Sequence, residues 1–141
     1  MKELSEHILD IAKNSVEAGA ARVDLTLDQG ADGWLTIVVA DNGRGMDEAL
    51  LRRVSDPFTT TRTTRKVGMG IPLYRQTAEQ TGGTLDIQSA LGVGTVVTAT
   101  VNTRHLDCPP AGDLAGTVAL LIQGSPEADF TYRHTTPRGE A

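Results

Sequence analysis

Two oxygen-bearing side chains, Asp10 and Asn14, stand four residues apart in a segment with helical periodicity. Residues at this spacing lie on one face of a helix, so the carboxylate and the amide would point the same way. Mg²⁺ prefers oxygen ligands and keeps several waters, so the pair could bind it through one protein oxygen together with phosphate oxygens and orient a water beside it. Taken alone, the pair is more simply interpreted as a solvated helix face.

A second motif, Asp41-Asn42-Gly43-Arg44-Gly45, directly follows an apolar segment that resembles a buried strand. A carboxylate at the end of a strand can accept a hydrogen bond from an exocyclic amine. Glycines allow the backbone to approach a flat ring closely or to turn with a positive φ. An ordinary Asn-Gly turn explains the same residues equally well.

A third motif, Gly68-Met69-Gly70-Ile71-Pro72, leads into a predicted helix. A helix N-terminus exposes unpaired N–H groups at the positive end of the dipole, which favours phosphate. The segment Thr59 to Gly70 contains no acid, and its bases are Arg62, Arg65 and Lys66. The motif is neither a dinucleotide fingerprint, because no strand precedes it and a third glycine is missing, nor a P-loop, because no Gly-Lys-Ser/Thr follows. A solvated basic loop is the alternative.

Hydrophobic periodicity predicts the elements that must position these motifs. The first helix is indicated by an apolar stripe at helical spacing, formed by Leu4, Ile8, Ile11, Ala12 and Ser15. The predicted helices cover about 4–18, a short stretch after Asp47, 71–80 and 113–123, and the predicted strands cover 22–28, 35–40, 84–89, 95–101 and 129–134. The first two strands suit an antiparallel hairpin, because the loop between them is short and rich in turn residues.

This order of elements predicts an α+β fold: a two-layer sandwich in which a mixed, mostly antiparallel sheet carries its helices on one face. We expect residues 1–104 to form the domain. Residues 105–141 would form a small extension, a helix and a strand with a frayed end, that packs on the sheet edge or offers a partner surface.

The composition of the chain argues against several classes of function. The net charge of −5 disfavours a nucleic-acid-coating role, because affinity for a polyanion comes mainly from clustered Lys and Arg. The single cysteine, Cys108, excludes an internal disulfide and favours a reducing compartment. The acidic N-terminus does not suit a signal peptide, and the longest apolar stretch, residues 114–122, is too short to cross a bilayer. We expect a soluble cytoplasmic domain that binds neither nucleic acid nor membrane.

Taken in order, the motifs resemble the boxes of the GHKL, or Bergerat-fold, ATP-binding family. This family includes gyrase-type and mismatch-repair ATPases, histidine kinase catalytic domains and anti-sigma-factor serine kinases. The resembling segments are Asp10–Ala20 for the N box, Asp41–Met46 for the first glycine box, Asp56–Arg62 for the opening of the ATP lid, Gly68–Gly70 for the second glycine box and Gly92–Thr95 for the late Gly-Thr turn. Each box is weak alone, but the ordered set spans roughly residues 4 to 103.

The resemblance implies ATP and Mg²⁺ as ligands and assigns roles by position. Asn14 would bind Mg²⁺, Asp41 would contact the adenine amine, and Thr95 would support the base through its hydroxyl. Asp10 falls where the family's ATPases and serine kinases place a general-base glutamate, and it is one methylene shorter. The remaining nucleotide-binding candidates are Gly43, Gly45, Met46, Phe58, Arg62, Arg65, Lys66, Gly68, Met69 and Gly70.

Two functional hypotheses follow. In the first, the γ-phosphate passes to a partner protein or slowly to water, with Asp10 activating the acceptor. In the second, ATP orders the lid and creates a partner surface with little or no turnover. Both imply a protein partner, from signalling or redox regulation, and a homodimer is possible. His7 lies inside the first predicted helix, and we interpret it as structural or pocket-lining rather than as a phospho-acceptor.

Overall fold

The computed structural model describes residues 4–55, 70–106, 108, 112–124, 128–136 and 139–140. Its elements, in chain order, are α1 (Leu4–Glu17), β1 (Arg22–Gln29), β2 (Trp34–Asp41), α2 (Glu48–Ser55), α4 (Gly70–Gln80), β3 (Thr84–Ala90), β4 (Gly94–Asn102), α5 (Leu114–Gly124), β5 (Asp129–Thr136) and β6 (Gly139–Glu140). Most bounds lie within one or two residues of those predicted from periodicity. None of the helices among these residues combines the length and the apolar character needed to cross a bilayer.

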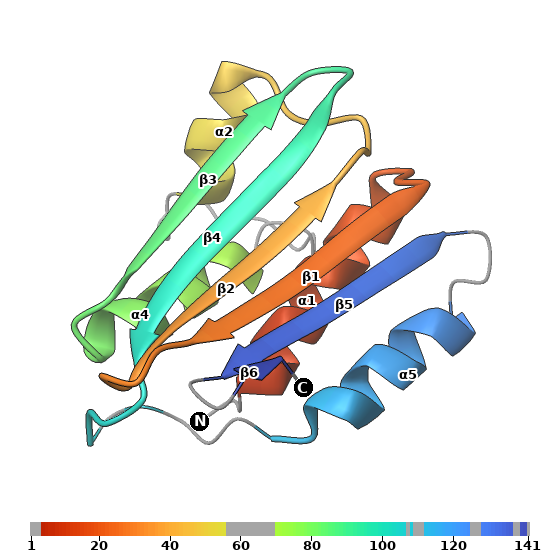
Figure 1. The fold of residues 1–141 in the computed structure, drawn as a ribbon. Helices are drawn as coiled ribbons and strands as arrows, with labels where there is room; N and C mark the ends of the chain where they lie inside the picture. Colours follow the sequence, from red (N-terminus) through yellow and green to blue (C-terminus); the bar gives the residue numbers. More distant parts are fainter. Residues whose placement is uncertain are drawn as a thin grey trace.

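The strands form a single mixed sheet in the order β3-β4-β2-β1-β5-β6 (Figure 1). The pairing is antiparallel except between β1 and β5, which run parallel. The predicted hairpin of β1 and β2 is confirmed by a register that runs from Val23 opposite Asp41 to Gln29 opposite Leu35. Gly33 closes this hairpin with a φ of 93°, a conformation that glycine adopts without steric cost.

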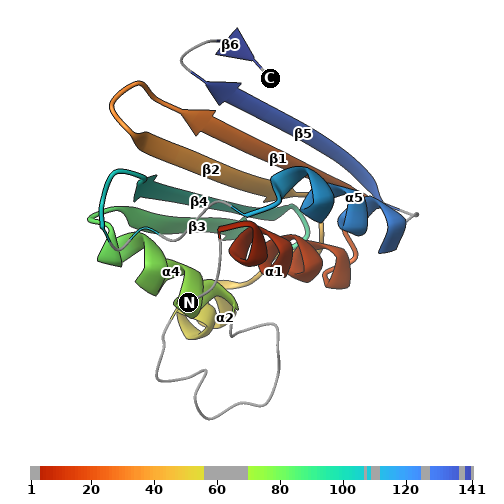
Figure 2. The same ribbon diagram turned by 90° about the horizontal axis from the view of Figure 1, so that it is seen from below.

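The core lies between the sheet and the helices, all of which lie on one side of it (Figure 2). Alternate residues of a strand point to opposite faces, so one face of each strand is apolar and buried. The apolar stripe of α1 packs onto this face and removes its side chains from water, which is the main stabilising term of the fold. The buried strand residues include Val23, Leu25, Leu27, Leu35, Ile37, Val39, Val97, Ala99 and Val101. The predicted α+β two-layer sandwich is therefore correct.

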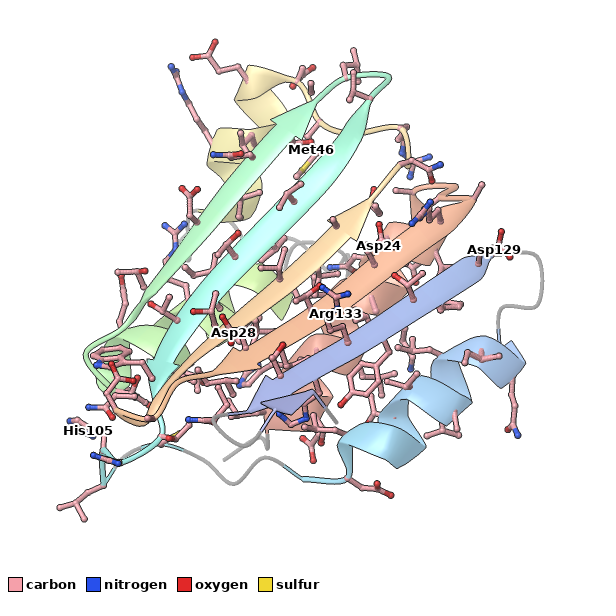
Figure 3. All side chains as sticks on the ribbon, in the orientation of Figure 1. Asp24, Asp28, Met46, His105, Asp129 and Arg133 are labelled. Carbon is pink, nitrogen blue, oxygen red and sulfur yellow. The ribbon has the colours of Figure 1, made fainter. Side chains whose placement is uncertain are left out.

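The opposite face of the sheet carries polar residues. Asp24, Asp28 and Arg133 lie on this face, away from α1 and α4 (Figure 3). Thr131 donates a hydrogen bond to the Asp24 carboxylate, and this bond, together with Arg22, outweighs desolvation and lowers the pKa of Asp24. A solvated face of this kind is normal for a sheet that is covered on one side only.

The segment after β4 adds to the sheet edge. Asp113 caps α5, because its Oδ1 accepts a hydrogen bond from the Gly116 N–H at 2.9 Å. The helix α5 packs beside α1 and carries the chain back to β5, and a parallel strand pair requires such a crossover. Near the end of the chain, β6 pairs with the end of β5, and this pairing satisfies backbone groups of both segments.

Candidate functional site

The Asp41 carboxylate lies at the last residue of β2 and is held on both oxygens. Its Oδ2 accepts a hydrogen bond from the Ser15 hydroxyl at 2.6 Å, and its Oδ1 accepts one from the Gly43 N–H at 2.8 Å. An ionised carboxylate offers about four acceptor positions, so each oxygen keeps capacity for a further donor. The strand end therefore presents a fixed acceptor that suits an amine.

Thr95 lies directly opposite Asp41 in the ladder of β2 and β4, so the two side chains share the face that packs against the helices. Its hydroxyl is 2.8 Å from the Ser89 hydroxyl. Ser89 accepts a hydrogen bond from the Met46 N–H at 2.8 Å and can donate one to the Gly94 carbonyl at 3.0 Å. Because hydroxyl protons rotate, Thr95 can act as a donor or as an acceptor beside Asp41.

Three glycines allow the segments around Asp41 to pack closely. Gly45 has a φ of 71°, and a Cβ there would lie 2.0 Å from the Ala90 carbonyl oxygen. Gly94 has a φ of 144°, and its Cβ would lie 2.0 Å from the Asp41 carbonyl oxygen. At Gly43 the nearest atoms, on Ala18, would be 3.0 Å away. The glycines of the motif thus join the end of β2 to α1 and to the turn between β3 and β4.

The side chain of Asn42, the second residue of the motif, makes hydrogen bonds that stabilise the fold. Its Oδ1 accepts hydrogen bonds from the N–H groups of Ala21 and Arg22, at 2.9 and 2.8 Å. The Asn42 side chain therefore anchors the start of β1 to the end of β2. The bond from Gly43 to Asp41 is the local contact of an ordinary Asx turn, whereas the bond from Ser15, 26 residues away in sequence, is one that such a turn does not need.

An open pocket of about 290 Å³ adjoins Asp41 and Thr95. The described residues that line it come from the end of β2, from β3 and β4, and from the turn between them: Asp41, Gln88, Ser89, Ala90, Val93, Gly94, Thr95 and Val96. The wall is mostly apolar, and it includes residues of both sheet faces, because Gln88, Ala90 and Val96 alternate with Ser89 and Thr95 along their strands. A mostly apolar wall suits a flat ring.

Asp10 and Asn14 continue a row of α1 that faces α4. The row begins with His7, whose Nε2 lies 2.9 Å from the Thr77 hydroxyl and whose ring stacks on Tyr74 at 5.1 Å. Residues three and seven positions after His7 lie on the same flank of the helix. Both Asp10 and Asn14 are half-buried there. His7 is buried in helix packing, as the structural interpretation predicts.

The first residue of α4, Gly70, lies toward the Asp41 end of the sheet. The other end of α4 is fixed near Asn102, whose N–H donates to the Thr81 hydroxyl at 3.0 Å. Asn102 pairs with Trp34, at the opposite end of β2 from Asp41. The positive end of the α4 dipole is therefore directed toward the end of the sheet that carries Asp41.

The structure brings together Asp41, Gly43, Gly45, Met46 and Thr95, and it places Asp10 and Asn14 on the adjoining flank of α1. The Met46 side chain is half-buried against the core, and its backbone N–H joins the Ser89 network. Six predicted residues lie outside the described residues: Phe58, Arg62, Arg65, Lys66, Gly68 and Met69. Ser15 and Ser89 were assigned no role from sequence, although both bond directly to predicted site residues.

Comparison with known proteins identifies the family of the chain. Residues 2–105 match the family model described as histidine kinase-, DNA gyrase B-, and HSP90-like ATPase. The chain is 32% identical to sporulation kinase D of Bacillus subtilis over 99 residues, which is 70% of this chain and 19% of that protein. It is 33% identical to the histidine protein kinase DivJ of Caulobacter vibrioides over 101 residues, 68% of this chain and 17% of that one.

A solved structure supports the fold beyond the matched family region. The N-terminal domain of a DNA repair protein superposes with a TM-score of 0.58 and 13% identity, covering 99% of this chain and 50% of that chain. At this identity the likeness concerns the fold alone. This chain spans less than one fifth of the length of the two kinases, so it corresponds to one domain of each. The family match covers residues 2–105, and on that basis the chain belongs to the histidine kinase-, DNA gyrase B- and HSP90-like ATPase family, whose domain supports ATP binding.

Proposed function

We propose that this domain binds ATP with Mg²⁺ and transfers the γ-phosphate to a partner protein, with slow hydrolysis when the partner is absent. The observation that carries the proposal is the Asp41 carboxylate, which is held at 2.6 Å by Ser15 and at 2.8 Å by Gly43 and retains acceptor capacity. Family membership supports ATP as the ligand. The transfer, the metal and the partner are our proposals.

At the base end, Asp41 accepts a hydrogen bond from the exocyclic amine of adenine. Thr95 contacts the same ring edge, since its hydroxyl can turn to donate or to accept. Gly43 and Gly45 let the segment after β2 pack closely against Ala18 and Ala90 and so shape the base pocket, and Gly94 holds the turn between β3 and β4 against the Asp41 backbone. These groups select and orient the base, and they take no part in bond cleavage.

At the phosphate end, we propose that Asp10 and Asn14, on the flank of α1 that faces α4, act together with the N-terminal side of α4. The Asn14 amide oxygen is a donor of the type that Mg²⁺ prefers. When bound, Mg²⁺ supplies neutralisation of the phosphate charge. The N–H groups at the start of α4 and its dipole favour the phosphates, and we propose that Gly68, Met69 and Gly70 lie against them. We assign the bases Arg62, Arg65 and Lys66, and the Phe58 ring, to the same ligand.

Asp10 is the proposed general base. It accepts the proton of the attacking hydroxyl, of the partner or of water, while a new bond forms to the γ-phosphorus and the bond to the leaving ADP oxygen breaks. Catalysis of this kind rests mostly on positioning and charge stabilisation, so a compact domain can perform it if the partner presents the acceptor. Asp10 is half-buried on the flank that faces α4, where a group can be both fixed and reached.

The test uses γ-labelled ATP with purified protein and candidate partners, and it compares Asp10→Asn with the wild type. We expect Asp10→Asn to keep ATP affinity within about twofold and to lose 10²- to 10⁴-fold in turnover, the usual contribution of a general base. Glu17→Gln, an exposed carboxylate on the same helix, is the matched control and should change neither.

Asn14→Ala should weaken binding only when Mg²⁺ is present. If wild-type protein binds ATP but Asp10→Asn leaves all label transfer and phosphate release unchanged, the catalytic role of Asp10 is wrong. The nucleotide-responsive binding module then becomes the better explanation, and partner affinity with and without ATP measures it.

A further inference from the structure

Ser15 is a buried polar residue in the apolar stripe of α1. Its side chain is 4% exposed and lies on the side of the helix that packs on the sheet. Its hydroxyl is 2.6 Å from Asp41 Oδ2, which joins two residues that are far apart in sequence. Ser15 also directly follows Asn14, so the proposed metal ligand and the contact to Asp41 are consecutive residues of one helix.

The position of the hydroxyl proton follows from the two available acceptors. Ser15 Oγ is 3.4 Å from the Ile11 carbonyl oxygen, the usual acceptor for a serine inside a helix. The contact with Asp41 Oδ2 is shorter by 0.8 Å, from 3.4 to 2.6 Å, and falls in the range of O–H···O⁻ bonds to an ionised acceptor. A carboxylate at the end of this contact can only accept. Ser15 therefore donates its single proton to Asp41.

We propose that Ser15 is a positioning residue that makes Asp41 selective for purines with an amine at position 6, an inference that rests on the proposed function. With Gly43 bonded to Oδ1 and Ser15 to Oδ2, the carboxylate plane cannot rotate without breaking a hydrogen bond. Its remaining acceptor positions then point in fixed directions. A 6-amino group can donate to them, whereas a 6-oxo group brings an oxygen against a negatively charged oxygen, which is unfavourable.

Without the Ser15 hydroxyl, the bond to Gly43 is the one that Asp41 keeps among the described residues, and its carboxylate can turn about its terminal torsion. The 6-amino group then loses an acceptor that is already oriented. The free energy needed to order the Asp41 carboxylate lowers the affinity for the nucleotide. A 6-oxo purine has no amine at position 6 and can offer Asp41 only its N1–H, so we expect its binding to depend less on the orientation of that acceptor. A purely structural role would instead lower the affinity of both nucleotides by the same factor.

The experiment measures calorimetric affinities for ATP and for inosine triphosphate, which differ at position 6, in wild-type protein, Ser15→Ala, Ser15→Cys and Asp41→Asn. We expect Ser15→Ala to weaken ATP binding about tenfold, the equivalent of about 1.4 kcal/mol, and to change the affinity for inosine triphosphate less than about twofold. Ser15→Cys has a side chain of similar volume but a weaker hydrogen-bond donor, so it should also lower the affinity for ATP relative to that for inosine triphosphate. This second variant keeps the test valid if Ser15→Ala fails to fold.

Ser5→Ala is the matched control, because Ser5 lies on the same helix and is also 4% exposed. It should leave both affinities unchanged. If the wild type binds ATP and Asp41→Asn loses it, but both Ser15 variants keep the wild-type ratio of affinities, the role of Ser15 is overturned while the proposed function stands. If the wild type binds neither nucleotide, or Asp41→Asn binds ATP like the wild type, the proposed base contact fails and the role of Ser15 fails with it.

Discussion

The helix α1 has two flanks that are built from different contacts. On the flank toward α4, His7 stacks on Tyr74 and lies 2.9 Å from the Thr77 hydroxyl, and the row continues into Asp10 and Asn14. On the flank toward α5, a groove of about 400 Å³ is lined mainly by apolar side chains, together with Lys13 and Glu17. One flank is polar and partly enclosed, and the other is mainly apolar with two charged side chains, Lys13 and Glu17.

The difference shows where this fold can recognise a ligand. We call the polar flank, together with the Asp41 end to which it leads, the ligand side. Hydrogen bonds depend on direction, so the side chains of the ligand side tolerate little displacement. Apolar packing has no comparable direction, so the α5 side can stabilise the sheet without specifying a ligand. The comparison predicts that changes on the ligand side alter nucleotide binding, while changes on the α5 side alter stability alone.

The largest expected effect comes from Gly94→Ala. The new Cβ would lie 2.0 Å from the Asp41 carbonyl oxygen at a φ of 144°, so the turn between β3 and β4 must separate from the end of β2. We expect the free energy of unfolding to fall by about 3 kcal/mol or more, because backbone strain adds to the steric conflict. Urea unfolding measures this, and ATP affinity should also fall because Asp41 shifts.

Gly92→Ala, in the same turn, separates the cost of backbone strain from the cost of a steric clash. Gly92 also has a positive φ, 81°, but a Cβ there meets nothing within 4 Å. Its cost should be limited to about 1–2 kcal/mol of left-handed backbone strain, without a change in ATP affinity. Equal losses in the two variants would contradict the argument that Gly94 is needed for close packing against Asp41.

Leu121→Ala tests the α5 side. Leu121 is 3% exposed and belongs to the core, so its truncation should lower the free energy of unfolding by about 2–4 kcal/mol. The neighbouring Leu120 is 61% exposed, and Leu120→Ala should cost less than about 0.5 kcal/mol. Both folded variants should bind ATP like the wild type. A loss of ATP affinity in folded Leu121→Ala would show that the two flanks are coupled, and it would break the comparison.

Asp41→Asn tests the ligand side directly. The amide retains the size of the carboxylate but loses its charge and one acceptor oxygen. We expect ATP affinity to fall about 10- to 150-fold, as for a hydrogen bond to a charged group worth about 1.5–3 kcal/mol. Asp24→Asn is the control, because Asp24 lies on β1 but on the opposite face of the sheet. Titration calorimetry should show no effect for Asp24→Asn, and a similar loss in both would indicate an effect of net charge alone.

The fold was predictable because its strongest signals are local. The stripe from Leu4 to Ser15 and the alternation in β1 each specify a buried face within one segment. The parallel pairing of β5 with β1 was not predictable. Arg22 and Asp129 are more than a hundred residues apart, and neither segment has a sequence pattern that identifies the strand it pairs with. The pairing of β6 was missed for the same reason.

The residues of the candidate site likewise divide into those that the sequence predicts and those that it does not. Asp41 was predicted from a short motif with a recognisable chemistry and Thr95 from the resemblance of Gly92–Thr95 to the late Gly-Thr turn, and their roles in nucleotide binding stay predictions. Ser15 was counted only as part of the apolar stripe, although a serine at a buried helix position needs a hydrogen-bond partner and is a signal in its own right. Ser89 could be assigned only from the register that places it opposite Thr95, which depends on where the β3–β4 turn closes.

The smallest expected effect, from Tyr74→Phe, is expressed as a pH dependence. The Tyr74 side chain is fully buried, and its hydroxyl has no hydrogen-bond partner among the described residues. Burial raises the pKa of Tyr74 above its usual value of about 10. The unfolded chain therefore loses this proton first, so the stability that Tyr74 confers is complete below about pH 10 and falls as the pH rises further, by at most about 1.4 kcal/mol per pH unit.

Tyr74→Phe removes this dependence together with an unsatisfied hydroxyl. At pH 7 the variant should be as stable as the wild type or about 1 kcal/mol more stable, because the stacked ring remains against His7. Urea unfolding between pH 8 and 11 should show a shallower decline for Tyr74→Phe, while Tyr132→Phe, a partly exposed tyrosine, should show a smaller change. Parallel declines in all three proteins would mean that the Tyr74 hydroxyl is solvated. The boundary of α1 with α4 would then be open to water, and the contrast between the two flanks would rest on the Asp41 end alone.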